Sequence, residues 1–267
     1  MSKATSTTAA RVPGDGYVQS FARGLAVIRS FSAEAPSQTM TEVAQRTGLT
    51  RAGARRILHT LHALGYVEID GRQFRLTAKV LDLGFAYLSS LPLWSLAEPF
   101  VEDLVRDVQE SSSVAVLNDQ DIVYVLRVPT HKIMSINLGV GSRLPAYCSS
   151  MGRVLLASLA DDTLAQHLAS TDFVARTPHT LTDPGQVREA ILQVREQGWA
   201  LIDQELELGL ISLAAPISGR SGKVLAAVNV GLHSSRMNAE DAKQAVLPKL
   251  LKTARQITER VIHSGAY

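Results

Sequence analysis

Residues 39–76 constrain the fold of this chain more than any other segment, because their pattern predicts two short helices followed by a two-stranded ribbon. Thr39 and Glu42 are spaced as a capping box, in which a hydroxyl and a carboxylate each accept a hydrogen bond from a backbone N–H group left free at a helix start. Gly48 can adopt the left-handed conformation that ends this helix. The segment therefore opens with a helix whose two ends are both marked.

A second helix is predicted over residues 51–64, with Thr50 as its N-terminal cap and Gly65 at its end. Helical spacing divides its residues into two sides. The apolar side consists of Ala54, Ile57, Leu58, Leu61 and Leu64, and the polar side of Arg51, Arg55, His59 and His62. Such a helix is expected to bury one side and to expose a cationic one.

A β-hairpin is predicted directly after this helix. Residues 66–69 and 72–76 flank the pair Asp70-Gly71, and Asp-Gly between alternating runs is the strongest short signal for a tight hairpin turn. A helix-turn-helix followed by a hairpin is a winged helix, and a cationic helix of this size fits the major groove of DNA.

Seven residues of this unit are candidates for contact with DNA: Thr50, Arg51, Arg55, Arg56, His59, Arg72 and Arg75. Arginine can bind a guanine edge through two hydrogen bonds, but most protein–DNA hydrogen bonds go to the backbone, so one of the three helix arginines is expected to hold phosphate. The helix start at Thr50 can also present backbone N–H groups to phosphate. The alternative is an ordinary solvated helix face and, for Arg72 and Arg75, an ordinary strand surface.

The distribution of charge supports the DNA-binding interpretation. The chain has 267 residues and a net charge of +2, which by itself indicates little. Residues 17–79, however, contain nine Lys and Arg against four Asp and Glu, whereas residues 80–267 contain sixteen against twenty. Positive charge is therefore concentrated where phosphate must be neutralised, and the larger part of the chain has no electrostatic reason to bind nucleic acid.

Several other classes of site are disfavoured. Cys148 is the only cysteine, which excludes an intrachain disulfide, and the seven histidines show no metal-binding spacing. Gly139-Val140-Gly141 lacks the third glycine of a dinucleotide site, and residues 219–223 are too short for a phosphate-binding loop. No secretory signal or membrane-length apolar run is found, so we expect a soluble, cytoplasmic protein without metal or cofactor.

The length and a hydrophobic content of 46% favour two packed domains. We predict a disordered tail over residues 1–16, a winged helix-turn-helix domain over 17–79, a linker helix over 80–97 and a second domain over 98–267. In the second domain, strands (one of them over residues 133–138) alternate with helices, and one helix kinked at Pro248 is expected over residues 238–263. The predicted class is α+β, with an antiparallel sheet flanked by helices that suits the enclosure of a small molecule.

From Tyr17 onward the chain resembles the IclR-type bacterial transcription regulators. The resemblance is carried by Phe21-Ala22-Arg23-Gly24-Leu25, Leu64-Gly65-Tyr66-Val67, residues 144–157 and residues 203–210. Residues 51–56, 127–130 and 145–148 further resemble the branch that regulates the β-ketoadipate pathway, the PcaR, PcaU and PobR type. Many relatives have Ser-Thr where this chain has Ala52-Gly53, so base discrimination is expected to depend on the helix arginines, and Gly53 costs its helix about 1 kcal/mol relative to Ala.

This resemblance implies a DNA-binding dimer that can assemble into a tetramer, with a GAF-like effector domain that senses aromatic acids or their breakdown products. It places the small acid above the sheet, beside Ser149, Ser150 and Met151 and the strand that carries Ser212. The backbone N–H groups of that turn precede a predicted helix and can hold a carboxylate, and a plain capping turn is the alternative.

The further candidates for the effector site are Asp203, Ile136, Leu144, Tyr147, Leu210, Arg143 and Arg127. Ser212 and Asp203 can exchange hydrogen bonds with a hydroxyl group, while the aliphatic residues can line a slot for a ring or simply pack in the core. The two arginines can pair with a carboxylate or form surface salt bridges, and Tyr147 can stack on a ring or cover the sheet. A nucleophilic Cys148 is disfavoured, because it replaces the first glycine of the Gly-x-Ser-x-Gly turn.

The expected function is therefore a regulator that binds double-stranded operator DNA and a small aromatic acid, with 4-hydroxybenzoate or protocatechuate suggested by the resemblance. The effector is expected to favour one arrangement of domains or subunits by binding it more tightly. Two alternatives remain open. One is an enzyme of small aromatic acids with an appended DNA-binding unit, although the sequence shows no catalytic constellation, and the other is a DNA-binding protein without small-molecule input.

Overall fold

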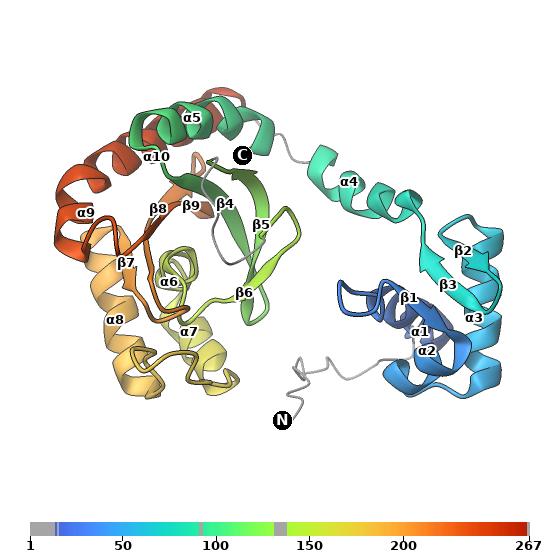
Figure 1. Cartoon of the computed structure of the whole chain (residues 1–267). Helices are drawn as coiled ribbons and strands as arrows, with labels where there is room; N and C mark the ends of the chain where they lie inside the picture. The colour runs from blue at the N-terminus through green and yellow to red at the C-terminus, as the bar shows by residue number, and fades with distance from the viewer. Residues whose placement is uncertain (1–13, 15, 91–92, 131–137, 266–267) are drawn as a thin grey trace. The chain divides into compact units, whose positions relative to one another are not determined.

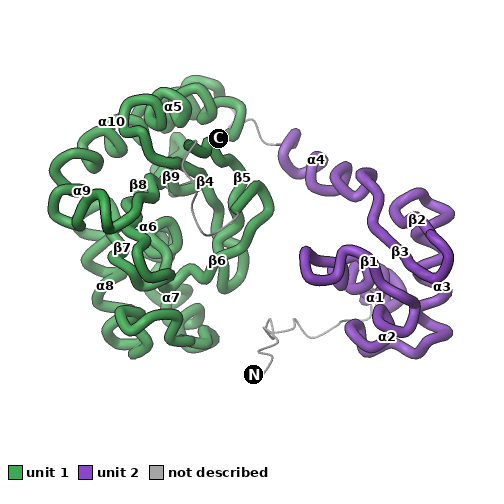
Figure 2. Tube along the Cα trace, viewed as in Figure 1, with its two compact units in different colours: residues 1–9, 91–267 green, residues 10–90 purple. Residues whose placement is uncertain are grey.

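The computed structural model describes residues 14, 16–90, 93–130 and 138–265 of the chain. It divides the chain into two compact units, residues 10–90 and residues 91–267, here called the N-terminal and the C-terminal unit (Figure 2). The predicted tail over residues 1–16 lies almost entirely outside the described residues, and so does the strand predicted over residues 133–138.

The N-terminal unit is a winged helix-turn-helix followed by one more helix, as predicted (Figure 1). Its elements are α1 (Gln19–Arg29), β1 (Ser37–Thr39), α2 (Met40–Thr47), α3 (Arg51–Ala63), β2 (Val67–Asp70), β3 (Gln73–Leu76), a 3-10 turn (Ala78–Val80) and α4 (Leu81–Ser90). The three strands form an antiparallel sheet in the order β1-β3-β2. Strand β1 was not predicted, because three residues are too few to show an alternating pattern.

The local signals of the sequence account for the boundaries of these elements. The Thr39 hydroxyl accepts the Glu42 N–H at 3.3 Å and the Glu42 carboxylate accepts the Thr39 N–H at 2.7 Å, which confirms the capping box. Gly48 ends α2 with a φ of +66°, and Gly71 turns the hairpin with a φ of +60°. A small core then forms between α1, α2, α3 and the wing, and it includes Val27, Val43, Ala54, Leu58, Leu61, Val67 and Phe74.

The C-terminal unit is built around one six-stranded antiparallel sheet in the order β6-β5-β4-β9-β8-β7. Its strands are β4 (Ser111–Asn118), β5 (Asp121–Val128), β6 (Arg143–Pro145), β7 (Ala200–Asp203), β8 (Leu210–Ser218) and β9 (Val224–His233). Its helices are α5 (Leu93–Val108), α6 (Ser150–Ala157), α7 (Asp161–Ala169), α8 (Pro184–Gln197), α9 (Ala239–Ala245) and α10 (Leu247–His263). This arrangement confirms the predicted α+β class.

Helices cover both faces of this sheet (Figure 1). Helices α5 and α10 pack together on one face, and α6 packs on the other against β4, β8 and β9, with α8 behind it. All eight residues of α6 are buried. The start of α6 therefore lies inside the unit and faces the middle of the sheet.

The single kinked helix predicted over residues 238–263 is wrong. The chain forms two helices, α9 and α10, with Val246 between them, and Pro248 occupies the first turn of α10. Proline is favoured there because the first backbone N–H groups of a helix have no partner within it, so Pro248 helps to start a helix and does not bend one.

In the part of the chain that is described, no single helix is long and apolar enough to cross a membrane. The segments 78–90 and 93–108 pass that test only when they are taken together.

Candidate functional site

The N-terminal unit has a groove between α3 and the β2–β3 hairpin, here called the α3 groove. Four of the residues predicted to contact DNA line it, namely Arg51, Arg55, His59 and Arg72, and all four are exposed. The remainder of the lining includes Thr39, Thr41, Ile69 and Phe74, and no acidic residue is among the described residues on its walls. The groove thus presents several positive charges that no carboxylate in its lining neutralises.

The other three residues predicted to contact DNA lie outside the lining of the α3 groove. The Thr50 hydroxyl accepts the Gly53 N–H at 3.1 Å and so caps α3. Arg56 is exposed on α3. The guanidinium of Arg75 lies 3.4 Å from Asp70 and 4.0 Å from Glu68, so its charge is partly balanced on the surface of the wing.

The C-terminal unit has a pocket between the sheet and the start of α6, here called the α6 pocket. Its apolar wall includes Leu138, Leu144, Met151, Ile202, Leu206 and Leu210. Its polar residues include Ser111, Ser113, Ser149, Ser150, Ser212 and Asn229, and Arg127 is the one charged residue among the described residues of the lining. A largely apolar cavity with a few converging polar groups is typical of small-molecule sites.

Three neighbouring strands supply the polar floor of the α6 pocket. Ser113 on β4 lies opposite Asn229 on β9, while Gly231 on β9 lies between Ser111 on β4 and Ser212 on β8. Side chains of directly opposed residues in an antiparallel sheet point to the same face, about 4.5–5.5 Å apart. The register of the sheet therefore gathers these polar groups into one patch.

Hydrogen bonds connect this patch to the start of α6. The Asn229 side chain accepts the Ser113 backbone N–H at 3.0 Å and donates to Ser212 Oγ at 3.0 Å. Ser212 Oγ in turn lies 2.7 Å from Ser150 Oγ and 3.3 Å from the Val230 carbonyl oxygen. The side chains of Ser113, Ser150, Ser212 and Asn229 are each at least nine-tenths buried, so this network lies away from bulk water.

No side chain caps the start of α6 in the described structure. The Ser149 hydroxyl, which occupies the capping position, donates instead to the Pro145 carbonyl at 2.8 Å. The backbone N–H groups of Ser150 and Met151 have no acceptor among the described residues. A helix start with free N–H groups carries partial positive charge and readily binds an anion.

Gly152 allows the turn before α6 to lie against the helix. A Cβ atom at this position would lie 2.1 Å from the carbonyl oxygen of Ala146 and 2.4 Å from its Cα atom. Only glycine permits so close an approach of two backbone segments. Gly152 therefore fixes the path of residues 145–149, of which Cys148 and Ser149 line the pocket.

A buried ion pair connects α6 with the loop between β7 and β8. Arg153 Nη2 is 2.6 Å from Glu205 Oε2, and both side chains are at most 10% exposed. Arg153 Nε also donates to the Tyr147 carbonyl at 3.1 Å, and Glu205 Oε2 accepts the Leu181 N–H at 3.3 Å. The pair therefore joins α6, the turn before it, and the loop between β7 and β8.

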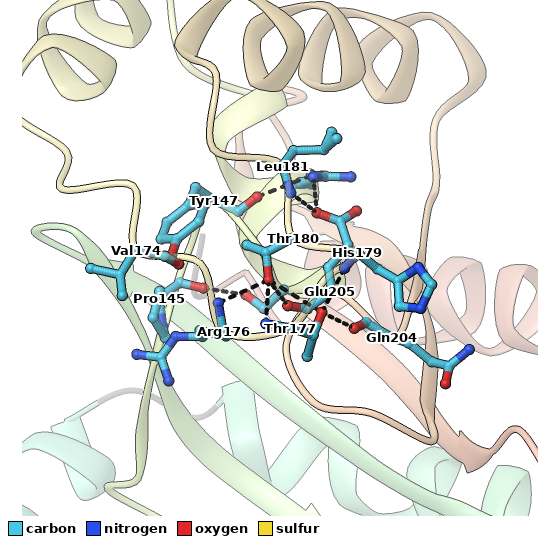
Figure 3. Close-up of polar contacts among 12 residues, drawn as sticks. Pro145, Tyr147, Val174, Arg176, Thr177, His179, Thr180, Leu181, Gln204 and Glu205 are labelled. Carbon is cyan, nitrogen blue, oxygen red and sulfur yellow. Dashed lines mark hydrogen bonds and ion pairs between the residues drawn. The ribbon is translucent and has the colours of Figure 1, made fainter.

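The segment between α7 and α8 is tied to the same loop by hydroxyl groups (Figure 3). Thr177 donates to the Gln204 carbonyl at 2.6 Å, and Thr180 donates to the Glu205 carbonyl at 2.5 Å. Tyr147 donates its hydroxyl to the Val174 carbonyl at 2.5 Å, and burial raises the pKa of this tyrosine to about 12.

The structure brings some of the predicted effector-site residues together and not others. Those that line the α6 pocket are Ser149, Ser150, Met151, Ser212, Leu144, Leu210 and Arg127. Tyr147 is held by Val174, Arg143 pairs with Asp121 at 3.0 Å, and Asp203 is exposed at the end of β7, so these three are not in the lining. Ile136 lies outside the described residues.

The residues that form the floor of the pocket, above all Ser113 and Asn229, were not predicted from the sequence. Two signals were present in the sequence. Three consecutive serines begin strand β4, and a single asparagine lies among the apolar residues that precede His233 in strand β9. Polar residues inside a buried strand are costly unless they are hydrogen-bonded, so they mark a place where polar groups meet.

The chemistry of the pocket favours binding over nucleophilic catalysis. Burial raises the pKa of Cys148 from 9.0 to about 11, so its thiol is protonated at neutral pH and is a poor nucleophile. Burial also raises the pKa of Tyr124 to about 12. Over the described residues, no group of three His, Cys, Asp or Glu side chains is placed to hold a metal ion.

Comparison with known families gives one consistent result. Residues 20–71 match the IclR helix-turn-helix domain, and residues 85–259 match the family described as bacterial transcriptional regulator IclR C-terminal. The chain is 45% identical over 246 residues to the Pca regulon regulatory protein of Pseudomonas putida, covering 92% of this chain and 84% of the relative.

Solved structures agree with this comparison. A putative transcriptional regulator from Rhodococcus sp. RHA1 superposes with a TM-score of 0.82 at 49% identity, over 92% of this chain and 98% of that one. A double mutant of the inducer-binding domain of the PobR transcription factor from Acinetobacter, in complex with 3-hydroxybenzoic acid, has a TM-score of 0.59 at 28% identity, over 62% of this chain and 97% of that one.

Proposed function

Because this chain belongs to the IclR family of bacterial transcriptional regulators, we propose that its C-terminal unit senses a small aromatic acid and its N-terminal unit binds operator DNA. The leading candidates for the effector are 4-hydroxybenzoate and protocatechuate. The observation that carries this proposal is the α6 pocket, in which a polar floor and an uncapped helix start face an apolar wall. The related PobR domain with bound 3-hydroxybenzoic acid supports the chemical class of the ligand.

The proposed pose follows from the two kinds of surface in the pocket. The carboxylate would accept hydrogen bonds from Ser150 and from the free N–H groups at the start of α6, where the helix dipole favours negative charge. The ring would lie against the aliphatic wall, including Leu144, Ile202 and Leu210. Arg127, which has no ion-pair partner among the described residues, would add favourable charge from the neighbouring strand.

For DNA we propose that Arg51, Arg55, His59 and Arg72, together with the backbone at Thr50, contact the operator through the α3 groove. Arg56 and Arg75 would lie at its margin and contact phosphate. Helix α3 is expected to lie in the major groove, with the wing beside it on the backbone.

We further propose that the protein binds DNA as a dimer, which can pair again into a tetramer. Helices α1 and α4 support this, because they expose large apolar side chains: Phe21 is 67% exposed, Leu81 73% and Phe85 68%. Large apolar side chains exposed on a surface commonly mark an interaction site. Pairing through the DNA-binding domain and the linker region, residues 80–97, would place two α3 helices on two half-sites of the operator.

Two measurements on the full-length protein test the proposal. Footprinting on the promoters of the genes next to its own gene should reveal a protected, pseudo-palindromic site. A thermal-shift panel should show stabilisation by 4-hydroxybenzoate or protocatechuate, since a ligand at a hundred times its Kd adds about 2.7 kcal/mol to the free energy of unfolding. If no aromatic acid raises the melting temperature, the sensor proposal fails, whatever the footprint shows.

The proposal also implies that the protein binds and releases the effector without altering it chemically. Incubation of the purified protein with each acid, followed by chromatography, should return the acid in full. Measurable turnover would revive the alternative of an enzyme with an appended DNA-binding unit.

A further inference from the structure

We infer that Asn229 sets the hydrogen-bond polarity of the α6 pocket and thereby makes it select a carboxylate over a neutral hydroxyl group at the start of α6. The inference rests on the proposed function, because it concerns the same pocket. It follows from three hydrogen bonds between buried residues of β4, β8, β9 and α6, taken in order.

The first step fixes the orientation of the Asn229 side chain. The backbone N–H of Ser113 can only donate a hydrogen bond, so the Asn229 atom 3.0 Å away from it must be the carbonyl Oδ1. The amide nitrogen then faces Ser212 Oγ, also at 3.0 Å. A flipped amide would place two donors against each other at Ser113, with no water-exposed side to relieve them, since Asn229 is 8% exposed.

The second step concerns the hydroxyl of Ser212. Its oxygen accepts from the amide of Asn229, and its single hydrogen can go to Ser150 Oγ at 2.7 Å or to the Val230 carbonyl at 3.3 Å. Either hydroxyl can be the donor in the contact between Ser212 and Ser150. Because Asn229 donates to Ser212 and does not accept from it, the hydrogen of Ser212 is available to Ser150 whenever Ser150 donates to another group.

The third step gives the group that a ligand meets. Ser150 lines the pocket, and when its Oγ accepts from Ser212 its own hydrogen can donate to a ligand. The free backbone N–H groups of Ser150 and Met151 lie at the same helix start, so this end of the pocket presents donors. A carboxylate satisfies donors only, whereas a neutral alcohol or phenol would bury its own O–H without an acceptor, which is unfavourable.

An exchange of one atom in Asn229 tests this polarity. In Asn229→Asp, a carboxylate oxygen replaces the amide nitrogen, so Ser212 must donate to residue 229 and Ser150 must donate to Ser212. The oxygen of Ser150 would then face the ligand as an acceptor. We expect calorimetry to show a loss of benzoate affinity of about a hundredfold or more, together with a gain of a few fold in phenol affinity, relative to the wild type.

A matched variant separates this reversal from the added negative charge. Ser212→Ala breaks the relay without a change of charge and leaves the Ser150 hydrogen free to donate, so benzoate should lose less than about tenfold and phenol should gain nothing. If Asn229→Asp acted only by repelling the carboxylate of the ligand, the affinity for benzoate would fall and the affinity for phenol would not change. That result, or equal binding of phenol and benzoate by the wild type, would overturn the inference.

A measurement without ligand keeps the inference falsifiable if a variant does not fold or no acid binds. Neutron diffraction from the ligand-free wild type should place the deuterated amide nitrogen of Asn229 toward Ser212 Oγ, and an amide oxygen facing Ser212 would overturn the relay. If the amide is oriented as expected but neither 4-hydroxybenzoate nor protocatechuate binds, the proposed function fails and the polarity stands. If an acid binds but the amide oxygen faces Ser212, the polarity fails and the proposed function stands.

Discussion

Arg153 and Glu205 form a buried ion pair at 2.6 Å, and each partner holds a different wall of the α6 pocket. Arg153 fixes the carbonyl of Tyr147, which begins the turn that leads to Ser149 and Ser150. Glu205 directly precedes Leu206, which lies on the apolar wall. The two sides of the pocket are therefore linked through one guanidinium, although their residues are far apart in the sequence.

Removal of one partner of this pair should be costly. We expect Arg153→Met to lower the free energy of unfolding by about 3–5 kcal/mol, because it leaves the carboxylate of Glu205 buried and without its cation. Urea denaturation of the purified protein measures this loss. Arg195→Met is the matched control: Arg195 also binds carbonyl groups at the far end of α6, but its partner Asp161 is 72% exposed.

The control variant should lose much less, about 1 kcal/mol, since exposed ion pairs contribute little. Similar losses in both variants would show that the Arg153–Glu205 pair has no special weight in the stability of the unit.

A methyl group at position 152 should open the pocket. Gly152→Ala would bring a Cβ atom to 2.1 Å from the carbonyl oxygen of Ala146, so α6 and the turn before it must separate. We expect a destabilisation of about 1–3 kcal/mol, as for other overpacked sites, and a clear loss of effector affinity. Gly231→Ala is the control for folding, because its nearest neighbour is the Leu210 side chain at 3.8 Å. Unchanged stability and Kd in Gly152→Ala would contradict the close approach.

Much of the fold was predictable because its signals are local. The capping box of Thr39 and Glu42, the helix end at Gly48 and the turn at Asp70-Gly71 each involve residues within a few positions of one another. Strands β1 and β6, by contrast, have three residues each and exist only through pairing with a partner strand. No periodic pattern can develop over so short a length.

The pocket was less predictable, because distant strands create it. Ser113 and Asn229 are 116 positions apart in the sequence, and only the register between β4 and β9 places them opposite each other. Arg127 and Arg143 looked equivalent in the sequence. The structure places the first on the pocket wall and pairs the second with Asp121, a distinction that depends on strand order alone.

The free energy of unfolding should fall at mildly alkaline pH because the thiol of Cys148 is buried. Burial raises its pKa from 9.0 to about 11, so between these values the unfolded chain loses the thiol proton while the folded protein keeps it. The free energy of unfolding is then unaffected by this group below pH 9 and declines as the pH rises towards 11, by at most about 1.4 kcal/mol per pH unit.

Urea denaturation of the wild type and Cys148→Ala between pH 7 and pH 10.5 measures this contribution, together with the part of the pKa shift of Tyr147 that Cys148 causes. Tyr124, whose pKa is also raised, titrates in both proteins and cancels in the difference. The two stability curves should converge above pH 9, and parallel curves would show that the thiol is not shielded from solvent.

Arginines of the α3 groove should differ in the part of the DNA that they contact. Arg55, exposed on α3 within the groove, is placed to reach a base edge, so Arg55→Ala should weaken operator binding by about 1–3 kcal/mol and binding to random DNA far less. Arg72, on the wing, is placed to meet phosphate, so Arg72→Ala should weaken binding to both DNAs about equally and reduce the slope of log affinity against log salt by about 1. Mobility shifts with the footprinted operator and a random duplex, repeated at several salt concentrations, measure both effects.

Arg75→Ala provides the control for this comparison, since Arg75 lies on the same wing but faces Asp70 and Glu68. Its positive charge is already partly balanced, so its removal should weaken either DNA less than Arg72→Ala does. Equal losses for Arg55→Ala and Arg72→Ala on both duplexes would remove the assignment of α3 to the major groove. A loss from Arg75→Ala as large as that from Arg72→Ala would show instead that the acidic partners release Arg75 when DNA binds, and that the whole wing, not one arginine, carries the contact with phosphate.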